Sequence, residues 1–432
     1  MTRYILILFF LGLLGCSFDT RSGIWTDEKK IEKLKKNVSK IFESEKVLKK
    51  EINSNLILKI TEQSLSVQKP SNLQNDLGIT LIKKEINKSS KFKFSKISNF
   101  KYFEPELVFD GNNFVFFDDK GNILKFDKNF NLIWKKNFYT KQERKLKPIL
   151  NFYTIEKYLI VIDSIGKFYA VDLIGGDLIW SQYNKNPFNS QIKVSNNKIY
   201  AIDFNNILRC FSLKDGSELW KFNSENSFLK SNKRNSLILK NDIIYFNNSL
   251  GDILAIDAIK GSLIWQTPTQ SSSIYENSFS LINSDLVARD NDLIFSNNRN
   301  EFYSINLTNG IINWKQKINS TVRPIFFYDF IFTISEEGFF FILDRNSGNL
   351  IRSTDIFKNF NQKKREAIKP VGFIVDNEKM VISSNSGHLL NIDISTGKIN
   401  SIVKIDNGSI SRPFVFDQKL ILVKNDAIIK LN

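Results

Sequence analysis

Histidine and cysteine are nearly absent from this sequence of 432 residues, which has one histidine, His388, and two cysteines, Cys16 and Cys210. A single imidazole cannot form a multi-histidine metal site, and any acid–base chemistry that uses histidine must use this ring. Two cysteines exclude a paired CxxC zinc site and a disulfide framework. We expect Cys210 to be a small buried hydrophobic residue on a strand. We expect His388 to lie on the surface or between two repeats.

The composition predicts a folded chain with a large core. Hydrophobic residues make up 42% of the sequence and aromatic residues 13%, so the chain is not disordered overall. Its length fits two or three ordinary domains or one large repeat array.

Positive charge exceeds negative charge, with 61 Lys and Arg against 45 Asp and Glu and a net charge of +16. Such an excess favours an acidic partner, either nucleic acid or an anionic membrane surface. Residues 21–100 alone hold 18 Lys and Arg against 9 Asp and Glu, which is more than half of the excess. The alternative is a compositional bias toward Lys, Asn, Ile and Phe, which AT-rich coding sequences favour and which needs no partner.

The first residues form a targeting signal. A positively charged start precedes 11 apolar residues, 4–14, whereas a helix needs about 20 to span a bilayer. The end of this stretch resembles the bacterial lipobox, in which a leucine stands three residues before a cysteine. The resemblance implies that 1–15 are a signal peptide, that Cys16 is lipidated, and that 16–26 form a tether. Ser17 then implies sorting to the outer membrane, and an ordinary signal peptide with an incidental cysteine is the alternative.

Residues 27–90 form a separate N-terminal segment. Between residues 27 and 52, apolar residues recur at alternating spacings of three and four, as on one helix face, at Ile31, Leu34, Val38, Ile41, Leu48 and Ile52. This pattern predicts a helix over 27–52, which either packs on the main domain or presents a surface to a partner or membrane. Residues 53–90 have weak periodicity, and we expect an extended segment or loop.

From about residue 100 onward the chain repeats itself. The clearest copy is GDILAIDAIKGSLIW at residues 251–265, and related copies place an Asp, Asn or Ser at 127, 172, 212, 257, 306, 344, 393 and 432. These positions are 38–49 residues apart, the period of a four-stranded propeller blade. Five of the six tryptophans occupy the same slot of the repeat: Trp134, Trp180, Trp220, Trp265 and Trp314. The sequence therefore predicts an all-β fold, an eight-bladed β-propeller over residues 91–432.

Each copy has the chemistry of a strand, a tight turn and a second strand. An aspartate caps its own turn and a glycine accepts positive φ, so the turn joins the last two strands of a blade. The tryptophan follows on the outer strand, where it can cover the interface between neighbouring blades.

Two further features predict how the ring is built. Prolines recur about 19–24 residues before the repeat Asp or Asn positions. We expect the first strand of a blade to begin there, because the first residue of a strand can lack an N–H group. These prolines are Pro105, Pro148, Pro324, Pro370 and Pro413. The last copy ends after its third strand. We expect residues 91–98 to supply its fourth strand, which closes the ring and removes an exposed sheet edge.

The blade motif resembles the pyrroloquinoline-quinone-type propeller repeat, and eight such blades behind a lipobox resemble the BamB-like outer-membrane lipoproteins. The resemblance implies a non-enzymatic scaffold on the periplasmic face of the outer membrane. Its implied partners are BamA, the barrel-inserting subunit, and unfolded outer-membrane proteins. The partner-contacting loops of the family correspond here to residues 227–236 and 280–285 and give Leu229, Lys230, Asn283 and Asp285 as candidate contacts.

The same repeat also occurs in quinoprotein dehydrogenases, which is one alternative. Such an enzyme should add a calcium site, a catalytic aspartate and often a vicinal cysteine pair, and this sequence has no such cysteine pair. We therefore assign no catalytic, cofactor-binding or metal-binding residues. A cell-envelope propeller with another ligand is a further alternative. The export signal disfavours a nucleic-acid partner.

Overall fold

The computed structural model describes residues 48–58, 71–82, 89–98, 100, 105–225, 233–269 and 281–431. The chain divides into two compact units, Met1–Val47 and Leu48–Asn432, and all of these residues belong to the second. The expected signal peptide, Cys16, the expected tether and most of the expected N-terminal helix lie outside the described residues.

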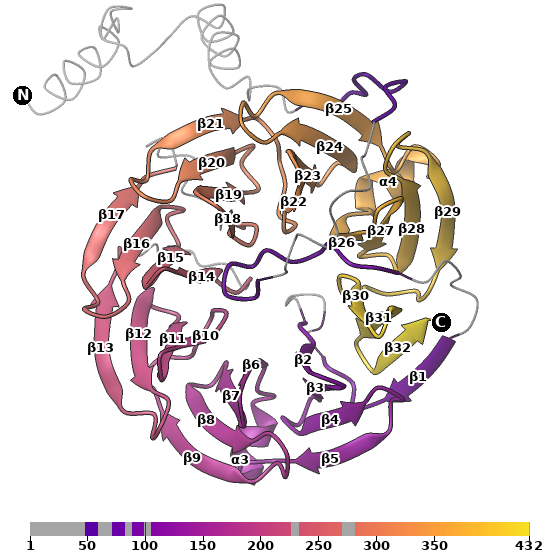
Figure 1. Cartoon of the computed structure of the whole chain (residues 1–432). Coiled ribbons are helices and arrows are strands. Elements are labelled where there is room, and N and C mark those ends of the chain that lie inside the picture. Colours follow the sequence, from indigo (N-terminus) through magenta and orange to yellow (C-terminus); the bar gives the residue numbers. More distant parts are fainter. Residues whose placement is uncertain are drawn as a thin grey trace, which may run out of the picture. The chain divides into compact units, whose positions relative to one another are not determined.

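The described residues form eight four-stranded antiparallel sheets, arranged as blades around a central axis (Figure 1). The first four blades are β2–β5 (Val108–Asp110, Asn113–Phe117, Ile123–Asp127, Leu132–Lys136), β6–β9 (Leu150–Ile155, Tyr158–Asp163, Lys167–Asp172, Leu178–Tyr183), β10–β13 (Lys193–Ser195, Lys198–Ile202, Ile207–Ser212, Glu218–Asn223) and β14–β17 (Leu237–Lys240, Ile243–Asn247, Ile253–Asp257, Leu263–Thr267). The next four are β18–β21 (Val287–Arg289, Asp292–Ser296, Phe302–Asn306, Ile312–Gln316), β22–β25 (Ile325–Phe327, Phe330–Ile334, Phe339–Asp344, Leu350–Asp355), β26–β29 (Pro370–Val375, Lys379–Ser384, His388–Asp393, Ile399–Lys404) and β30–β32 (Phe414–Phe416, Lys419–Lys424, Ala427–Leu431) with β1 (Ser89–Lys93). The predicted eight-bladed propeller is confirmed.

The eighth blade joins the two ends of the propeller. Strand β1 pairs antiparallel with β32, with Ser89 opposite Leu431 and Lys93 opposite Ala427. The closing strand was expected at 91–98, and it lies earlier. The reason is that β32 begins at Ala427, directly after a turn, so the chain beyond Lys93 has no strand to pair with.

The repeat aspartate and glycine form the predicted turn between the third and fourth strands. In the fourth blade the Asp257 carboxylate accepts backbone N–H groups of Ile259 and Lys260, both at 2.8 Å. The Gly261 N–H donates to the Asp257 carbonyl at 2.8 Å, and Gly261 has φ +72°. The side chain and the glycine together reverse the chain within a few residues.

Each tryptophan packs against the turn of the next blade. A Cβ added to Gly261 would lie 2.6 Å from the Trp220 ring, and one added to Gly310 would lie 2.6 Å from Trp265. The Trp265 indole N–H also donates to the Leu307 carbonyl of the next blade at 3.1 Å. The tryptophans therefore cover the interfaces between blades, as predicted.

Arg352 replaces the tryptophan in the sixth blade. Its guanidinium is fully buried and donates to the carbonyls of Ile394 and Ser395 in the turn of the seventh blade. It also donates to the carbonyl of Leu56 at 3.0 Å. A charged side chain thus holds this interface through hydrogen bonds instead of an aromatic face.

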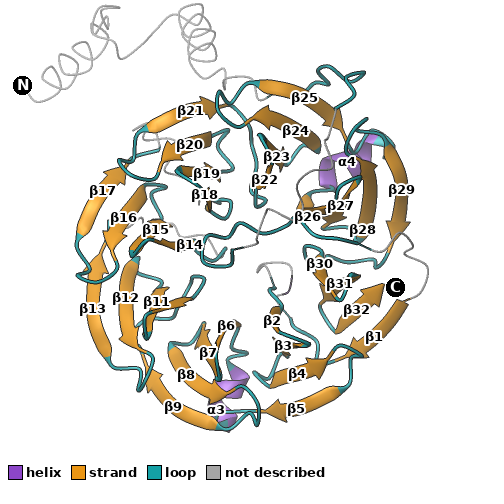
Figure 2. Cartoon of the chain, viewed as in Figure 1, coloured by secondary structure: helices purple, strands orange, loops and turns teal. Residues whose placement is uncertain are grey.

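The core lies between the faces of neighbouring blades. The second and third strands of each blade are buried on both sides, as in β4 with Ile123 at 0% and Leu124 at 2% exposure. The outer strands are less buried, as in β9 and β13, whose residues are all exposed or half-buried. Figure 2 shows strands throughout the ring, and the described connections between blades include two short helices, α3 (Lys141–Lys145) and α4 (Gln362–Ala367). Neither these nor any other helix in the described ranges is long and apolar enough to cross a membrane.

The C-terminal end of the helix expected over 27–52 is extended. The Ile52 backbone pairs with Ser353 of β25 through hydrogen bonds of 3.1 and 3.0 Å. The free outer edge of β25 offers backbone partners that a helix could not use, and this tertiary pairing overrides the helical pattern. Residues 53–58 and 71–82 are extended or form turns, as expected for this segment.

We predict that Gly261→Ala destabilises the propeller more than Gly111→Ala does. Both glycines have positive φ, which costs an alanine about 1–2 kcal/mol. A Cβ at Gly261 would contact the indole of Trp220, whereas nothing lies within 4 Å of a Cβ at Gly111. Displacing Trp220 should cost about 1–3 kcal/mol more. Urea unfolding of both variants measures the difference, and equal losses would contradict the packing of this interface.

Candidate functional site

Residues 71–82, here called the axial segment, cross the centre of the ring (Figure 1). At one end the backbone of Leu73 and Gln74 accepts N–H groups of Leu239 and Ala288 on the inner strands of the fourth and fifth blades. At the other end Thr80 and Gly78 pair with Val375 of the seventh blade. The segment thus joins inner strands on opposite sides of the axis.

Asn75 fixes the axial segment in place. Its side chain is 1% exposed. Its amide donates to the Gln191 side chain at 2.9 Å and to the Leu286 carbonyl at 2.9 Å. Its carbonyl oxygen accepts the Lys193 ammonium at 2.7 Å. The neighbouring Asp76 forms a bidentate ion pair with Arg289, both contacts at 2.7 Å.

Five charged residues meet beside the axial segment and form what we call the axial cluster: Glu106, Arg234, Asp285, Arg323 and Arg412. Each lies at or just before the start of an inner strand, and together they come from five different blades. The Glu106 carboxylate pairs with Arg234 and Arg412, and Arg323 lies 3.7 Å from it. The Asp285 carboxylate accepts Arg323 Nε at 2.7 Å, and Arg412 lies at 3.5 Å.

The arginines keep both carboxylates of the axial cluster ionised. Burial by itself would raise the pKa of Glu106, but the positive charges of Arg234, Arg412 and Arg323 hold this pKa well below its ordinary value. Burial by itself would also raise the pKa of Asp285. The positive charges of the neighbouring cations nevertheless lower this pKa, and Arg323 has the largest effect among them. The cluster is therefore a network of charges at neutral pH.

Lys193 lies on the inner strand of the third blade, between the axial segment and the cluster. Burial lowers its pKa to about 7, although the negative charge of Glu106 acts in the opposite direction. Its ammonium donates to the carbonyl of Asn72 and to Asn75. A change of charge at this lysine therefore occurs near neutral pH.

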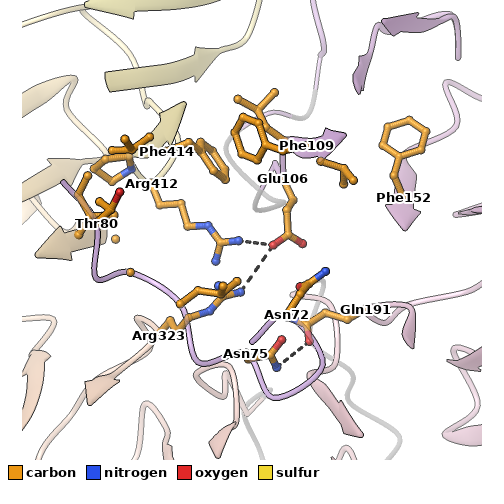
Figure 3. Close-up of a pocket in the computed structure, with 18 of the residues that line it drawn as sticks. Asn72, Asn75, Thr80, Glu106, Phe109, Phe152, Gln191, Arg323, Arg412 and Phe414 are labelled. Carbon is orange, nitrogen blue, oxygen red and sulfur yellow. Dashed lines mark hydrogen bonds and ion pairs between the residues drawn. The ribbon is translucent and has the colours of Figure 1, made fainter. Parts of the chain in front are cut away.

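A cavity of about 380 Å³ lies between the axial segment and the inner strands. The axial segment and the cluster arginines line it, as Figure 3 shows with Arg323 and Arg412 beside Glu106. Phe109, Phe152 and Phe414 also line it, on the first, second and eighth blades. Charged and aromatic side chains are neighbours in this lining, because the Arg412 guanidinium lies 5.3 Å from the centroid of the Phe414 ring.

His388 and Cys210 have structural surroundings. The His388 ring lies 2.9 Å from the Ser386 hydroxyl and packs edge-on against Phe360. Burial and the charges of Lys404 and Lys364 lower its pKa. Cys210 is fully buried, and burial raises its pKa to about 12, which confirms the expected small buried hydrophobic residue. No group of three or more His, Cys, Asp or Glu side chains within the described ranges is placed to hold a metal ion.

The candidate partner contacts fall in different environments. Leu229 and Lys230 lie outside the described residues and remain predictions. Asn283 is half-buried beside Asn297 in the connection that leads into the fifth blade. Asp285 is 1% exposed, so its carboxylate serves the axial cluster and is not available at the surface, because the chain turns inward there to begin β18.

The axial arginines were not identified from the sequence, although a signal for them exists. Arg323-Pro324 and Arg412-Pro413 place an arginine beside the proline that marks an inner strand, and Glu106 follows Pro105. Inner strands of a propeller converge on one axis, so charged residues in this slot of separate copies come together.

The fold and its repeats define an eight-bladed β-propeller of pyrroloquinoline-quinone-type repeats. A family model described as outer membrane protein assembly factor BamB matches residues 119–354, more than half of the chain. The protein therefore belongs to the BamB family.

Solved structures with the same fold include a BamB protein and quinohemoprotein alcohol dehydrogenases. BamB from Moraxella catarrhalis is 13% identical, with a TM-score of 0.63 over 79% of this chain and 100% of that chain. Quinohemoprotein alcohol dehydrogenase ADHIIG from Pseudomonas putida HK5 is 11% identical, with a TM-score of 0.58 over 79% of this chain and 75% of that chain. At these identities the likeness shows the fold alone. No curated protein sequence matches this chain.

The axial cluster predicts acid sensitivity. Because folding lowers the pKa of Glu106 and Asp285, their ionised forms stabilise the protein above their ordinary pKa values, and this stability is lost as the pH falls. We expect the free energy of unfolding to decrease below about pH 5. Asp285→Asn should weaken this pH dependence, and at pH 7 it should cost about 3–5 kcal/mol because Arg323 loses its buried partner.

Urea unfolding between pH 3 and pH 7 measures both effects. Asp177→Asn is the matched control, because this exposed carboxylate pairs with Lys136 at the surface, where an ion pair contributes about 0–1 kcal/mol. An Asp285→Asn variant with the pH dependence of the unaltered protein would contradict the role of the cluster.

Proposed function

We propose that this protein is a non-enzymatic scaffold of outer-membrane β-barrel protein assembly. In this proposal lipidated Cys16 anchors it to the periplasmic face of the outer membrane, and the propeller docks on the periplasmic domains of BamA. Membership of the BamB family and the likeness to the solved BamB fold support the role. The basic segment 21–100 follows the proposed anchor, where it would meet an anionic membrane surface or an acidic subunit.

The observation that carries a binding role is that one blade already holds an extended segment on its outer edge. Beside the backbone pairing of Ile52 with Ser353, the Asn53 amide donates to the Ile351 carbonyl at 2.8 Å and the Ser353 hydroxyl donates to the Lys50 carbonyl at 2.9 Å. This isolated antiparallel bridge uses the same backbone pairing as strand addition to a sheet edge, a recurring mode of peptide recognition.

The outer strands of other blades present the same kind of edge. No described residue pairs with the outer edges of β5, β9, β13, β17 and β21. Each of these strands exposes large aliphatic side chains next to its tryptophan, such as Leu263 and Ile264, both 46% exposed. The corresponding Leu350 and Ile351 of β25 are half-buried. We infer that these edges receive extended segments of unfolded barrel proteins.

We predict that Leu229→Ala combined with Lys230→Ala weakens binding to BamA without lowering thermal stability. The pair occupies the loop before the fourth blade that the family uses for contact, and alanine removes both the aliphatic and the cationic contact. Pull-down of BamA from detergent-solubilised envelope by the full chain, with thermal unfolding in parallel, measures the effect.

Leu146→Ala combined with Lys147→Ala is the matched control. It removes another Leu-Lys pair from a different loop, where Leu146 is 65% exposed. Equal retention of BamA by the two double variants would refute the site assignment. The assembly role would be contradicted if the unaltered chain retained another envelope protein but no BamA. A bound quinone in the purified protein would also contradict it.

The outer edges can be tested separately. A photo-crosslinking amino acid at Ile264 of β17 should capture a ten-residue peptide with alternating apolar and polar residues, because no described residue pairs with that edge. The same amino acid at Ile351 should capture much less, because Asn53 and its neighbours cover that edge. Mass spectrometry of the crosslinked chain gives the yields. Equal yields at the two positions would contradict strand addition at the open edges.

A further inference from the structure

The helices α3 and α4 lie on the same face of the propeller. Each blade has four strands, and neighbouring strands run in opposite directions. The connections from one blade to the next therefore lie on one face, and the turns between third and fourth strands lie on the other. Both helices belong to connections between blades, α3 between β5 and β6 and α4 between β25 and β26. We call their side of the ring the helix face.

The two connections that contain these helices carry a strong excess of positive charge. Residues 137–149 and 356–369 together hold nine Lys and Arg against two Glu. On α3, Lys141, Arg144 and Lys145 are exposed. The ion pairs at this connection join Glu143 to Lys167 and Lys147 to Asp119. No ion pair among the described residues uses Lys141, Arg144 or Lys145, so their charges face the solvent.

The turns on the opposite face have no such excess. The seven turns that join third and fourth strands, in the first seven blades, hold five Lys and Arg against seven carboxylates. Hydrogen bonds from Asn131 lower the pKa of Asp127, and the Lys260 N–H has the largest effect in lowering that of Asp257. These carboxylates are therefore ionised at neutral pH. An anionic surface is attracted to α3 and α4 and gains nothing from the opposite face.

The α3 connection also presents an apolar side chain. Leu146 follows the helix directly, between Lys145 and Lys147, and is 65% exposed. The helix is held against the ring because the Glu143 carboxylate accepts the Tyr183 hydroxyl at 2.6 Å and the Thr140 N–H at 2.7 Å. An apolar residue among cations, on a fixed support, has the composition of segments that lie in the interface of an anionic membrane.

We propose that the helix face of the propeller contacts an anionic membrane surface. The cations of α3 lie toward the lipid phosphates and Leu146 enters the interface. The exposed Lys363 and Lys364 of α4 form a second contact. The seventh, eighth and first blades separate the two helices (Figure 1), and such widely spaced contacts on one face fit a flat lipid surface better than a compact acidic patch of a protein. This contact goes beyond the docking role proposed above and does not require the lipid on Cys16.

Fluorescence of the full chain with lipid vesicles tests the proposal. A fluorescent amino acid whose emission rises in apolar surroundings replaces Leu146 or, as the matched control, Ile174. Ile174 is 78% exposed in a turn on the opposite face. Vesicles of phosphatidylcholine and phosphatidylglycerol should raise the emission at position 146 at least twofold over vesicles of phosphatidylcholine alone, and should leave position 174 unchanged. Salt at about 1 M, where the Debye length is about 3 Å, should remove most of the rise.

Two triple variants remove the same charge from opposite faces. The first combines Lys141→Gln, Arg144→Gln and Lys145→Gln on α3. The control combines Lys128→Gln, Lys214→Gln and Lys260→Gln in turns between third and fourth strands. All six residues are exposed, so both variants should fold. The first should lower the rise at position 146 by more than half, because each cation near an anionic membrane contributes to the attraction. The control should respond as the unaltered chain does.

Three results would overturn the proposal: equal emission at position 146 with the two kinds of vesicle, an equal rise at position 174, or equal losses in the two triple variants. Sedimentation with phosphatidylcholine vesicles tests the lipid anchor separately, because a chain without the anchor stays in solution there but still responds to phosphatidylglycerol. Docking on BamA is measured in detergent without a bilayer, so failure of that role and failure of the membrane contact are distinguishable.

Discussion

The pairing of β1 with β32 is the constraint on which the rest of the propeller depends. Ser89–Lys93 and Ala427–Leu431 lie more than 300 residues apart in the chain, yet they complete one blade. Without this pairing the eighth blade would have three strands and an open edge. Closure also fixes the angle at which neighbouring blades meet, so each tryptophan can reach the turn of the next blade. The central axis, with its cavity and its charges, exists only because the ring is closed.

The N-terminal segment contacts the propeller at two separate places. Near Ile52 it adds to the outer edge of β25, and between Asn72 and Thr80 it crosses the axis. The first contact shows that an outer edge can pair with another part of the chain, and the second forms one side of a cavity that charged and aromatic residues line together. Both follow from a propeller's general property of leaving outer edges and inner ends of strands unpaired.

Local patterns predicted the features that single repeats determine. The spacing of Asp257, Gly261 and Trp265 indicates a turn and an outer strand, because hydrogen bonds within a few residues form that turn. The pattern of Leu48 and Ile52 failed as a helix signal because a distant strand, β25, offered backbone partners. Asp285 was expected near a partner surface, but its loop turns inward toward Arg323. Each failure occurs where a contact over a long sequence separation overrides a local preference.

The sequence by itself determined the number of blades, the turn in each blade and the slot of each tryptophan, because these depend on residues close together in the chain. Only the tertiary structure decided what lies at the axis. Glu106 and Arg412 meet across 306 residues, and Asn75 meets Leu286 across 211. No sequence pattern within one repeat predicts these contacts. They arise because closure brings the inner strands of different blades to a common centre, where charges from separate repeats must compensate one another.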